Sequence, residues 1–163
     1  MNAKQQFIDS YLRESSTTTK VLRAYPADKS ELKPHHLCKS ARELAWIFVG
    51  EQGMCQVAMT TGFDWSKPPA APPAPDSLAQ IIQIFEQGSQ SLVDSVRKKD
   101  DALTGSVKFP TAPRTISDVP LEQFLWMTLC DQIHHRGQFS IYLRMADGKV
   151  PSIYGPTHDE PWF

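Results

Sequence analysis

Apolar residues recur at helical spacing in four long stretches of this chain. The stretches predict helices over residues 3–24, 40–60, 77–99 and 119–146. Two of these helices begin with a capping box, Ser40 with Glu43 and Ser77 with Gln80, in which side chain and backbone groups bond reciprocally. Gly148 follows the last stretch and is the expected stop signal of its helix.

The segments between the predicted helices differ in composition. Residues 62–75 are proline-rich and lack a helical period, so they should run extended at about 3.1 Å per residue. Such a segment reaches roughly 40 Å, which is longer than a 20-residue helix at roughly 30 Å. It can therefore connect two parallel helices. Residues 106–109 alternate in polarity like a short strand, for which no partner is expected, and Asp118 is the expected cap of the last helix.

Four amphipathic helices of this length predict an all-α fold, with a four-helix bundle as its simplest architecture. The length of 163 residues predicts a single domain, 1–163, with a core that needs no disulfides. The last helix is apolar on most of its sides, which indicates a central and largely buried position. Polar side chains in the middle of that helix should therefore need partners.

The charge balance argues against some partners. The chain has 17 basic and 18 acidic residues and a formal net charge of −1, which predicts no nucleic-acid partner. No run of 18 or more apolar residues occurs, so no membrane partner is expected. The three cysteines form no CxxC motif and are expected to stay reduced, as in the cytoplasm.

The most distinctive polar residues lie in the last predicted helix. Asp131 and His135 are four residues apart and share a helix face, so they can share a metal ion, share a proton or form a pair. Gln138 lies on the same side and is a candidate pocket residue. His134 points about 100° away, toward solvent or a backbone group. In the second helix, Glu51 interrupts an apolar face, where it either has a functional partner or reaches solvent or an arginine.

Three segments carry a resemblance to a known family: residues 134–138, which read His-His-Arg-Gly-Gln, and the segments 142–144 and 149–156. With them the chain resembles the DinB-like, or damage-inducible, family, which includes the YfiT-type metal-dependent hydrolases. The resemblance implies an up-down-down-up four-helix bundle, a long crossover between helices two and three, and frequent homodimers. The proline-rich segment 62–75 fits that crossover.

The resemblance also implies a divalent metal, often nickel or zinc, held by three histidines. The matching positions here are Ile47 in the second helix and Asp131 and His135 in the fourth, so only one histidine is kept. In one interpretation Glu51, one turn after Ile47, completes a site of two carboxylates and one imidazole that suits iron, manganese or zinc. In the other interpretation no metal binds, and Asp131 orients or charges His135.

Two functions follow from these alternatives. In the first, the chain is a metal-dependent hydrolase or thiol-S-transferase with a degenerate metal site, formed by His135, Asp131 and Glu51. Gln138, His134 and Ile47 are then expected around its pocket, and a metal would activate water or a thiol against an unidentified small molecule. In the second, the chain is a non-catalytic dimeric module that binds a small ligand or another protein and has lost its metal.

Overall fold

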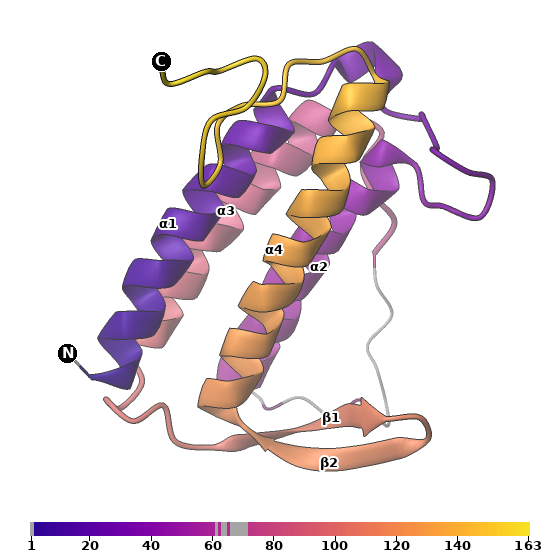
Figure 1. Ribbon diagram of the computed structural model, residues 1–163. Coiled ribbons are helices and arrows are strands. Elements are labelled where there is room, and N and C mark those ends of the chain that lie inside the picture. Colours follow the sequence, from indigo (N-terminus) through magenta and orange to yellow (C-terminus); the bar gives the residue numbers. More distant parts are fainter. Residues whose placement is uncertain (1, 61, 63–64, 66–71) are drawn as a thin grey trace.

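The computed structural model describes residues 2–60, 62, 65 and 72–163, and most of them are helical. Four long helices lie side by side, and α1 and α4 run in the opposite direction to α2 and α3 (Figure 1). α1 packs against α3 and α4, and α2 packs against the same two helices. Their bounds are Ala3–Arg23 for α1, Ala41–Thr60 for α2, Leu78–Arg97 for α3 and Leu121–Met145 for α4. A short 3-10 helix, Ala27–Lys29, follows α1.

The predicted capping box forms in full at the start of α2, and at the start of α3 one of its two bonds forms. The Ser40 backbone N–H donates to the Glu43 carboxylate at 2.7 Å, and the Glu43 N–H donates to Ser40 Oγ at 3.2 Å. Ser77 Oγ accepts from the Gln80 N–H at 3.4 Å. Because these bonds satisfy amide groups that have no partner within the helix, they fix where each helix begins.

The prediction of an all-α fold is wrong in one respect, because a β-hairpin precedes α4. Its strands are β1, Ser106–Ala112, and β2, Thr115–Pro120, which pair antiparallel. Arg114 has a φ of 61° and closes the tight turn. Val107 and Val119 face each other across the strands, and both are buried in the core. The pairing lets residues near 106 bury apolar surface at the end of the helices, which a lone strand could not do.

The hairpin also changes the start of α4. Asp118 is not its cap but lies in β2, where its carboxylate is 3.3 Å from Lys108 Nζ on β1. Pro120 occupies the cap position and makes no side-chain capping bond. α4 therefore starts directly from the strand, and its first backbone amide, that of Leu121, donates to the carbonyl of Gly105 at 2.9 Å.

The connection between α2 and α3 touches both ends of the helices. Near the hairpin, the Trp65 N–H donates to the Lys108 carbonyl at 3.0 Å. Near the start of α2, Trp46 Nε1 donates to the Pro72 carbonyl at 2.9 Å. Residues 72–75 are not helical. The predicted extended run 62–75 otherwise falls on residues outside the described part of the chain, namely 63–64 and 66–71.

α4 ends just before Gly148, which the sequence predicts as the stop signal, but the left-handed residue at this end is not the glycine. That residue is Asp147, with a φ of 61°. The Gly148 N–H donates back to the Leu143 carbonyl at 3.0 Å, which closes the last turn. Left-handed backbone is costly for residues other than glycine, and an acidic side chain is unfavourable at the negative end of a helix.

Asp147→Gly is therefore expected to stabilise the protein by about 0.5–1 kcal/mol, because both costs disappear. The measurement is the free energy of unfolding in urea. Asp147→Ala is the matched control, since it removes the charge but keeps the Cβ. Its gain in the free energy of unfolding should be smaller than that of Asp147→Gly. Equal or lower stability of the glycine variant would contradict the backbone argument.

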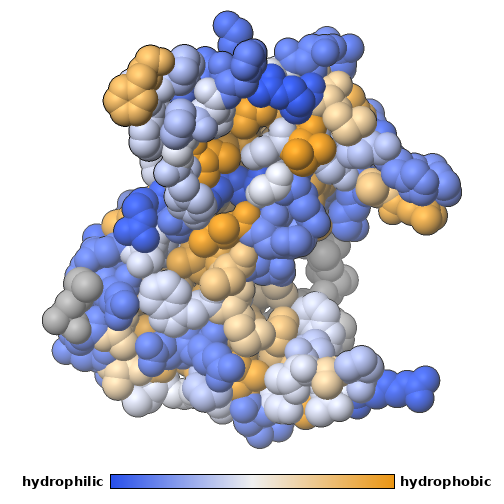
Figure 2. Space-filling view, viewed as in Figure 1, coloured by the Kyte–Doolittle hydropathy of each residue, from blue (hydrophilic) through white to orange (hydrophobic). Residues whose placement is uncertain are grey.

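The core consists of two apolar clusters separated by a layer of buried polar side chains. One cluster lies at the hairpin end and includes Phe7, Leu92 and Phe124. The other lies at the opposite end and includes Phe48 and Phe139. The polar layer between them draws on all four helices: Glu14, Ser15, Thr18, Glu51, Gln52, Ser89, Gln132 and Arg136. The face shown in Figure 2 is mostly hydrophilic, with hydrophobic side chains at the surface beside α4 and above the hairpin.

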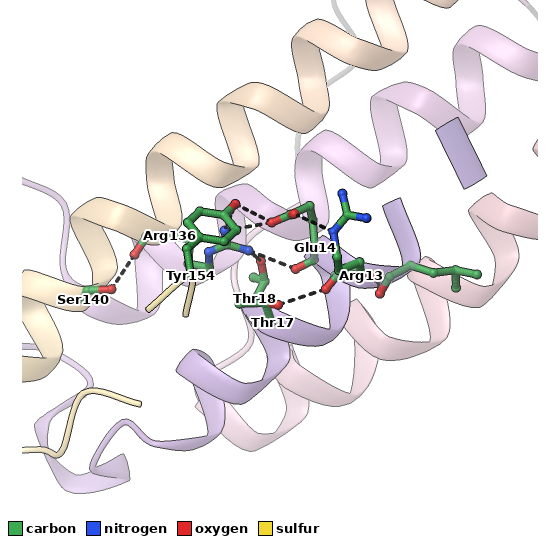
Figure 3. A network of polar contacts seen from close by, with 9 residues as sticks. Arg13, Glu14, Thr17, Thr18, Arg136, Ser140 and Tyr154 are labelled. Atoms are coloured by element: carbon green, nitrogen blue, oxygen red, sulfur yellow. Dashed lines mark hydrogen bonds and ion pairs between the residues drawn. The ribbon is translucent and has the colours of Figure 1, made fainter. Parts of the chain in front are cut away.

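One part of the polar layer is a buried ion pair between α4 and α1. Arg136 Nη2 lies 2.9 Å from the Glu14 carboxylate, and Nη1 donates to the Glu14 carbonyl at 3.1 Å (Figure 3). The hydroxyl of Tyr154, from the segment after α4, donates to the same carboxylate at 2.6 Å. Burial alone would raise the pKa of Glu14, but the hydrogen bonds from Tyr154 and Arg136 lower it below its usual range. The pair fixes how α4 sits against α1.

Among the described residues, no helix is both long enough and apolar enough to cross a membrane.

Candidate metal centre

Three acidic or imidazole side chains meet on the other side of α4, between α4 and α2. They are Glu51 from α2 and Asp131 and His135 from α4, and one ligand atom of each lies within 4.8 Å of the others. His135 Nε2 is 3.5 Å from Glu51 Oε1 and 3.7 Å from Asp131 Oδ1. The i,i+4 spacing on α4 brings Asp131 and His135 together, and the packing of α2 against α4 adds Glu51.

Glu51 is the least solvated member of this group. Its residue is only 2% exposed, and neither carboxylate oxygen has a hydrogen-bond partner among the described residues. Burial, together with the nearby Asp131 carboxylate, raises the pKa of Glu51 to about 9. A buried carboxylate without a partner is unfavourable unless it is protonated or coordinates a metal.

His135 is oriented by Gln138, one turn further along α4. The Gln138 carbonyl oxygen lies 3.0 Å from His135 Nδ1, so this nitrogen carries the proton and donates. The lone pair of Nε2 is then directed to the side where Glu51 and Asp131 lie. In a histidine that binds a metal through one ring nitrogen, the other ring nitrogen usually donates to a hydrogen-bond acceptor. The Gln138 amide nitrogen lies 3.0 Å from His134 Nε2, so Gln138 connects both histidines.

A second set of polar residues supports Glu51 from inside the core. Gln52 Nε2 lies 2.9 Å from Tyr11 Oη on α1 and 2.7 Å from Ser89 Oγ on α3. A Cβ on residue 88 would come 2.3 Å from Gln52 Oε1, so Gly88 makes room for this side chain. These contacts tie α2 to α3 and, across the core, to α1, and so hold Glu51 toward α4. These contacts were not predicted from the sequence, although a glutamine next to Glu51 in an apolar helix was a usable signal.

A pocket of about 580 Å³ opens beside Glu51 and Asp131, toward the hairpin. Its lining includes Glu51 and Met54 from α2, Phe109 from β1, and Trp126, Met127 and Asp131 from α4. His134 is also among the residues that line it.

The structure places the other two predicted pocket residues elsewhere. Gln138 is exposed and bonds the two histidines, and it is not among the residues that line this pocket. Ile47 is half-buried and packs against the apolar cluster at the end opposite the hairpin. At position 47 an alkyl side chain therefore occupies the place that the family resemblance gives to a histidine, and the side chain that faces Asp131 and His135 from α2 is Glu51.

The donor set of the three residues is two carboxylates and one imidazole nitrogen. These groups together suit a divalent first-row metal. The two buried oxygens of Glu51, which have no hydrogen-bond partner among the described residues, are available as ligands for such an ion. Without a metal, a Glu51 pKa of about 9 leaves its carboxyl protonated at neutral pH. The same three residues can therefore hold either a metal ion or a proton.

Solved structures of other proteins share this fold. A DinB-like protein from Bacillus cereus ATCC 10987 superposes with a TM-score of 0.76 at 21% identity, covering 92% of this chain and 97% of its own. The DinB-like protein YjoA from Bacillus subtilis gives a TM-score of 0.70 at 16% identity, covering 91% and 97%. Likeness at such low identity shows the fold alone.

Sequence comparison extends the likeness over nearly the whole chain. The uncharacterized protein YrdA from Bacillus subtilis (strain 168) is 25% identical over 156 residues, which are 94% of this chain and 89% of YrdA. The sequence profile of the DinB family matches residues 1–161. The chain therefore belongs to the DinB family.

Proposed function

We propose that this protein is a metal-dependent hydrolase or thiol-S-transferase that holds a divalent metal with Glu51, Asp131 and His135. The observation that carries the proposal is the Glu51 carboxylate. It is 2% exposed, has no hydrogen-bond partner among the described residues, and lies 3.5 Å from His135 Nε2. A metal ion would satisfy its oxygens and compensate its burial.

The three ligand types limit which metal ions can bind. Two carboxylates with one imidazole suit Fe(II), Mn(II), Zn(II) or Ni(II) rather than a soft ion that prefers thiolates. When bound, such a metal would lower the pKa of a water or thiol coordinated to it. Three protein ligands leave positions for such a group and for a substrate.

The side chains around the site have separate tasks in this proposal. Gln138 holds His135 in the tautomer that presents Nε2 to the site. Asp131, which is exposed and lines the pocket, faces both the site and the incoming small molecule. Gln52 keeps Glu51 in place through its contacts with α1 and α3.

Metal analysis tests the proposal. Protein purified without a histidine tag is expected to bind about one equivalent of Zn(II) or Mn(II) by calorimetry and elemental analysis. Glu51→Gln should weaken binding by about 100-fold or more, because an amide oxygen is a far poorer ligand than a carboxylate. Glu86→Gln, which changes a glutamate on α3 that pairs with Arg23, is the matched control and should bind as the wild type does. Less than about a tenth of an equivalent of any metal would contradict the proposal.

A second function is favoured by Ile47, which occupies a family ligand position with an alkyl side chain. In this alternative the protein is a non-catalytic dimeric module for a small ligand or another protein. His135 then pairs with Asp131 at 3.7 Å, and Glu51 is protonated. Ile47→His should create metal uptake if this alternative holds, whereas stoichiometric metal in the unchanged protein would exclude it.

The domain organisation, location and partners of the protein are also part of the proposal. We infer one domain over residues 1–163, with its helices in an up-down-down-up four-helix bundle, as the resemblance implied. The protein would act in the cytoplasm as a homodimer, on a small molecule and not on nucleic acid. The reduced state expected of Cys38, Cys55 and Cys130 and the net charge of −1 support this setting.

A further inference from the structure

The geometry points to a substrate class: we propose that the pocket accepts a small molecule with an uncharged aromatic or branched alkyl group. That group contacts the wall formed by Met54, Phe109, Trp126 and Met127, and the polar end of the molecule reaches Glu51. The inference rests on the proposed metal function for the polar end only. The apolar wall exists whether or not a metal binds.

The wall is built from three elements. Met54 comes from α2 next to Glu51, Phe109 comes from β1, and Trp126 and Met127 come from α4. Aromatic rings combined with methionine sulfurs form an adaptable surface that favours flat or branched apolar groups.

The aromatic members of the wall are held from behind. Phe109 packs edge-on against Phe124 of α4, with ring centroids 5.2 Å apart. Trp126 packs edge-on against Phe7 of α1, with ring centroids 5.5 Å apart. These contacts fix the rings before a ligand arrives, so little ordering is needed when an apolar group binds.

Along α4, Asp131 and His134 lie farther from the hairpin than Trp126 and Met127, so the strongest polar groups of the lining are on the side away from the hairpin. Gln123 and Thr128 are uncharged polar members of the same lining. A volume of about 580 Å³ is within the range of pockets for drug-sized molecules. A carboxylate placed against Met54 and Trp126 would lose its hydration without gaining a partner there, so an anionic tail should bind poorly.

Two hydroxamic acids test the wall in zinc-loaded protein. Acetohydroxamate and benzohydroxamate share the metal-binding end and differ in a methyl against a phenyl group. Benzohydroxamate is expected to bind about tenfold more tightly, from the additional apolar area buried. In Met127→Glu this ratio should fall to about two or less. Met145→Glu is the matched control, because Met127 and Met145 are both exposed methionines of α4, at 36% and 48%, and Met145 lies outside the pocket lining.

A metal-free measurement separates this inference from the proposed function. The neutral dye N-phenyl-1-naphthylamine should gain fluorescence on the metal-free wild type and on Met145→Glu, and lose most of that gain on Met127→Glu. If acetohydroxamate and benzohydroxamate bind equally tightly, or if Met127→Glu leaves the dye signal unchanged, the proposed apolar binding wall is wrong. The metal proposal is not affected by either result. If the protein does not bind zinc, the metal proposal is wrong. The dye measurement alone would then test whether the pocket binds apolar groups.

Discussion

Replacing Arg136 by methionine is expected to lower the free energy of unfolding by about 3–5 kcal/mol. Arg136 is 1% exposed and Glu14 is 6% exposed, so the substitution leaves a carboxylate in the core without its cation. The Tyr154 hydroxyl would remain as a donor to Glu14, but it supplies no charge. Breaking one side of a buried pair costs much more than removing both partners.

Urea unfolding followed by circular dichroism measures this loss. Arg144→Met is the matched control, because Arg144 is also on α4 and pairs with Asp159, but its side chain is exposed. It should change stability much less. The double variant Glu14→Gln with Arg136→Met should regain most of the loss, which keeps the test informative if the single variant does not fold. A single variant within about 1 kcal/mol of the wild type would contradict the role of the pair.

The stability of the metal-free protein is expected to fall with rising pH, because of Glu51. Its folded pKa of about 9 lies above the usual value of 4.5, so the folded state holds a proton that the unfolded state releases. The contribution is fully present below about pH 4.5 and is lost as the pH rises through 9. Within this window the slope is as much as about 1.4 kcal/mol per pH unit.

Glu51→Gln should remove this slope, since an amide of the same shape does not titrate. The measurement is the difference in unfolding free energy between the wild type and the variant at pH values from 5 to 9, in the presence of a chelator. The wild type should lose stability relative to the variant as the pH rises. With zinc in place of the chelator, the sign should reverse, because metal binding requires the deprotonated carboxylate. Parallel curves in chelator would show that Glu51 is not a buried acid.

The helices were predictable from the sequence, but the hairpin was not. Each helix has apolar residues at helical spacing, and α2 and α3 have N-caps that are visible in the sequence, so local information placed the helices. The start of α4 is the exception, because it depends on the hairpin. The hairpin turn at Pro113 and Arg114 has no glycine or asparagine, which are the residues that usually signal such a turn. Its strands mix polar and apolar residues without a sustained alternation. The pairing of Val107 with Val119, together with the packing of Phe109 against α4, explains why they fold onto the core.

The same limit applies to the site. Asp131 and His135 share a helix face by spacing alone, and Glu51 stands out as a carboxylate in an apolar stripe. Phe109 could not be placed near them, because its position depends on the hairpin. Trp126 and Met127 are indistinguishable from core residues in sequence, and only the packed structure shows that they line a pocket.

The buried pair of Arg136 and Glu14 sets an order of events during synthesis. Tyr154 and Glu14 are 140 residues apart in the chain, and Arg136 and Glu14 are 122 apart. At about 5–20 residues per second, a ribosome needs roughly 7–28 s to proceed from Glu14 to Tyr154. During that interval Glu14 must stay hydrated, so α1 cannot reach its final burial while the chain is growing. Completion of the polar layer is therefore a late step, and a chaperone that binds the apolar stripe of α1 would have that interval in which to act.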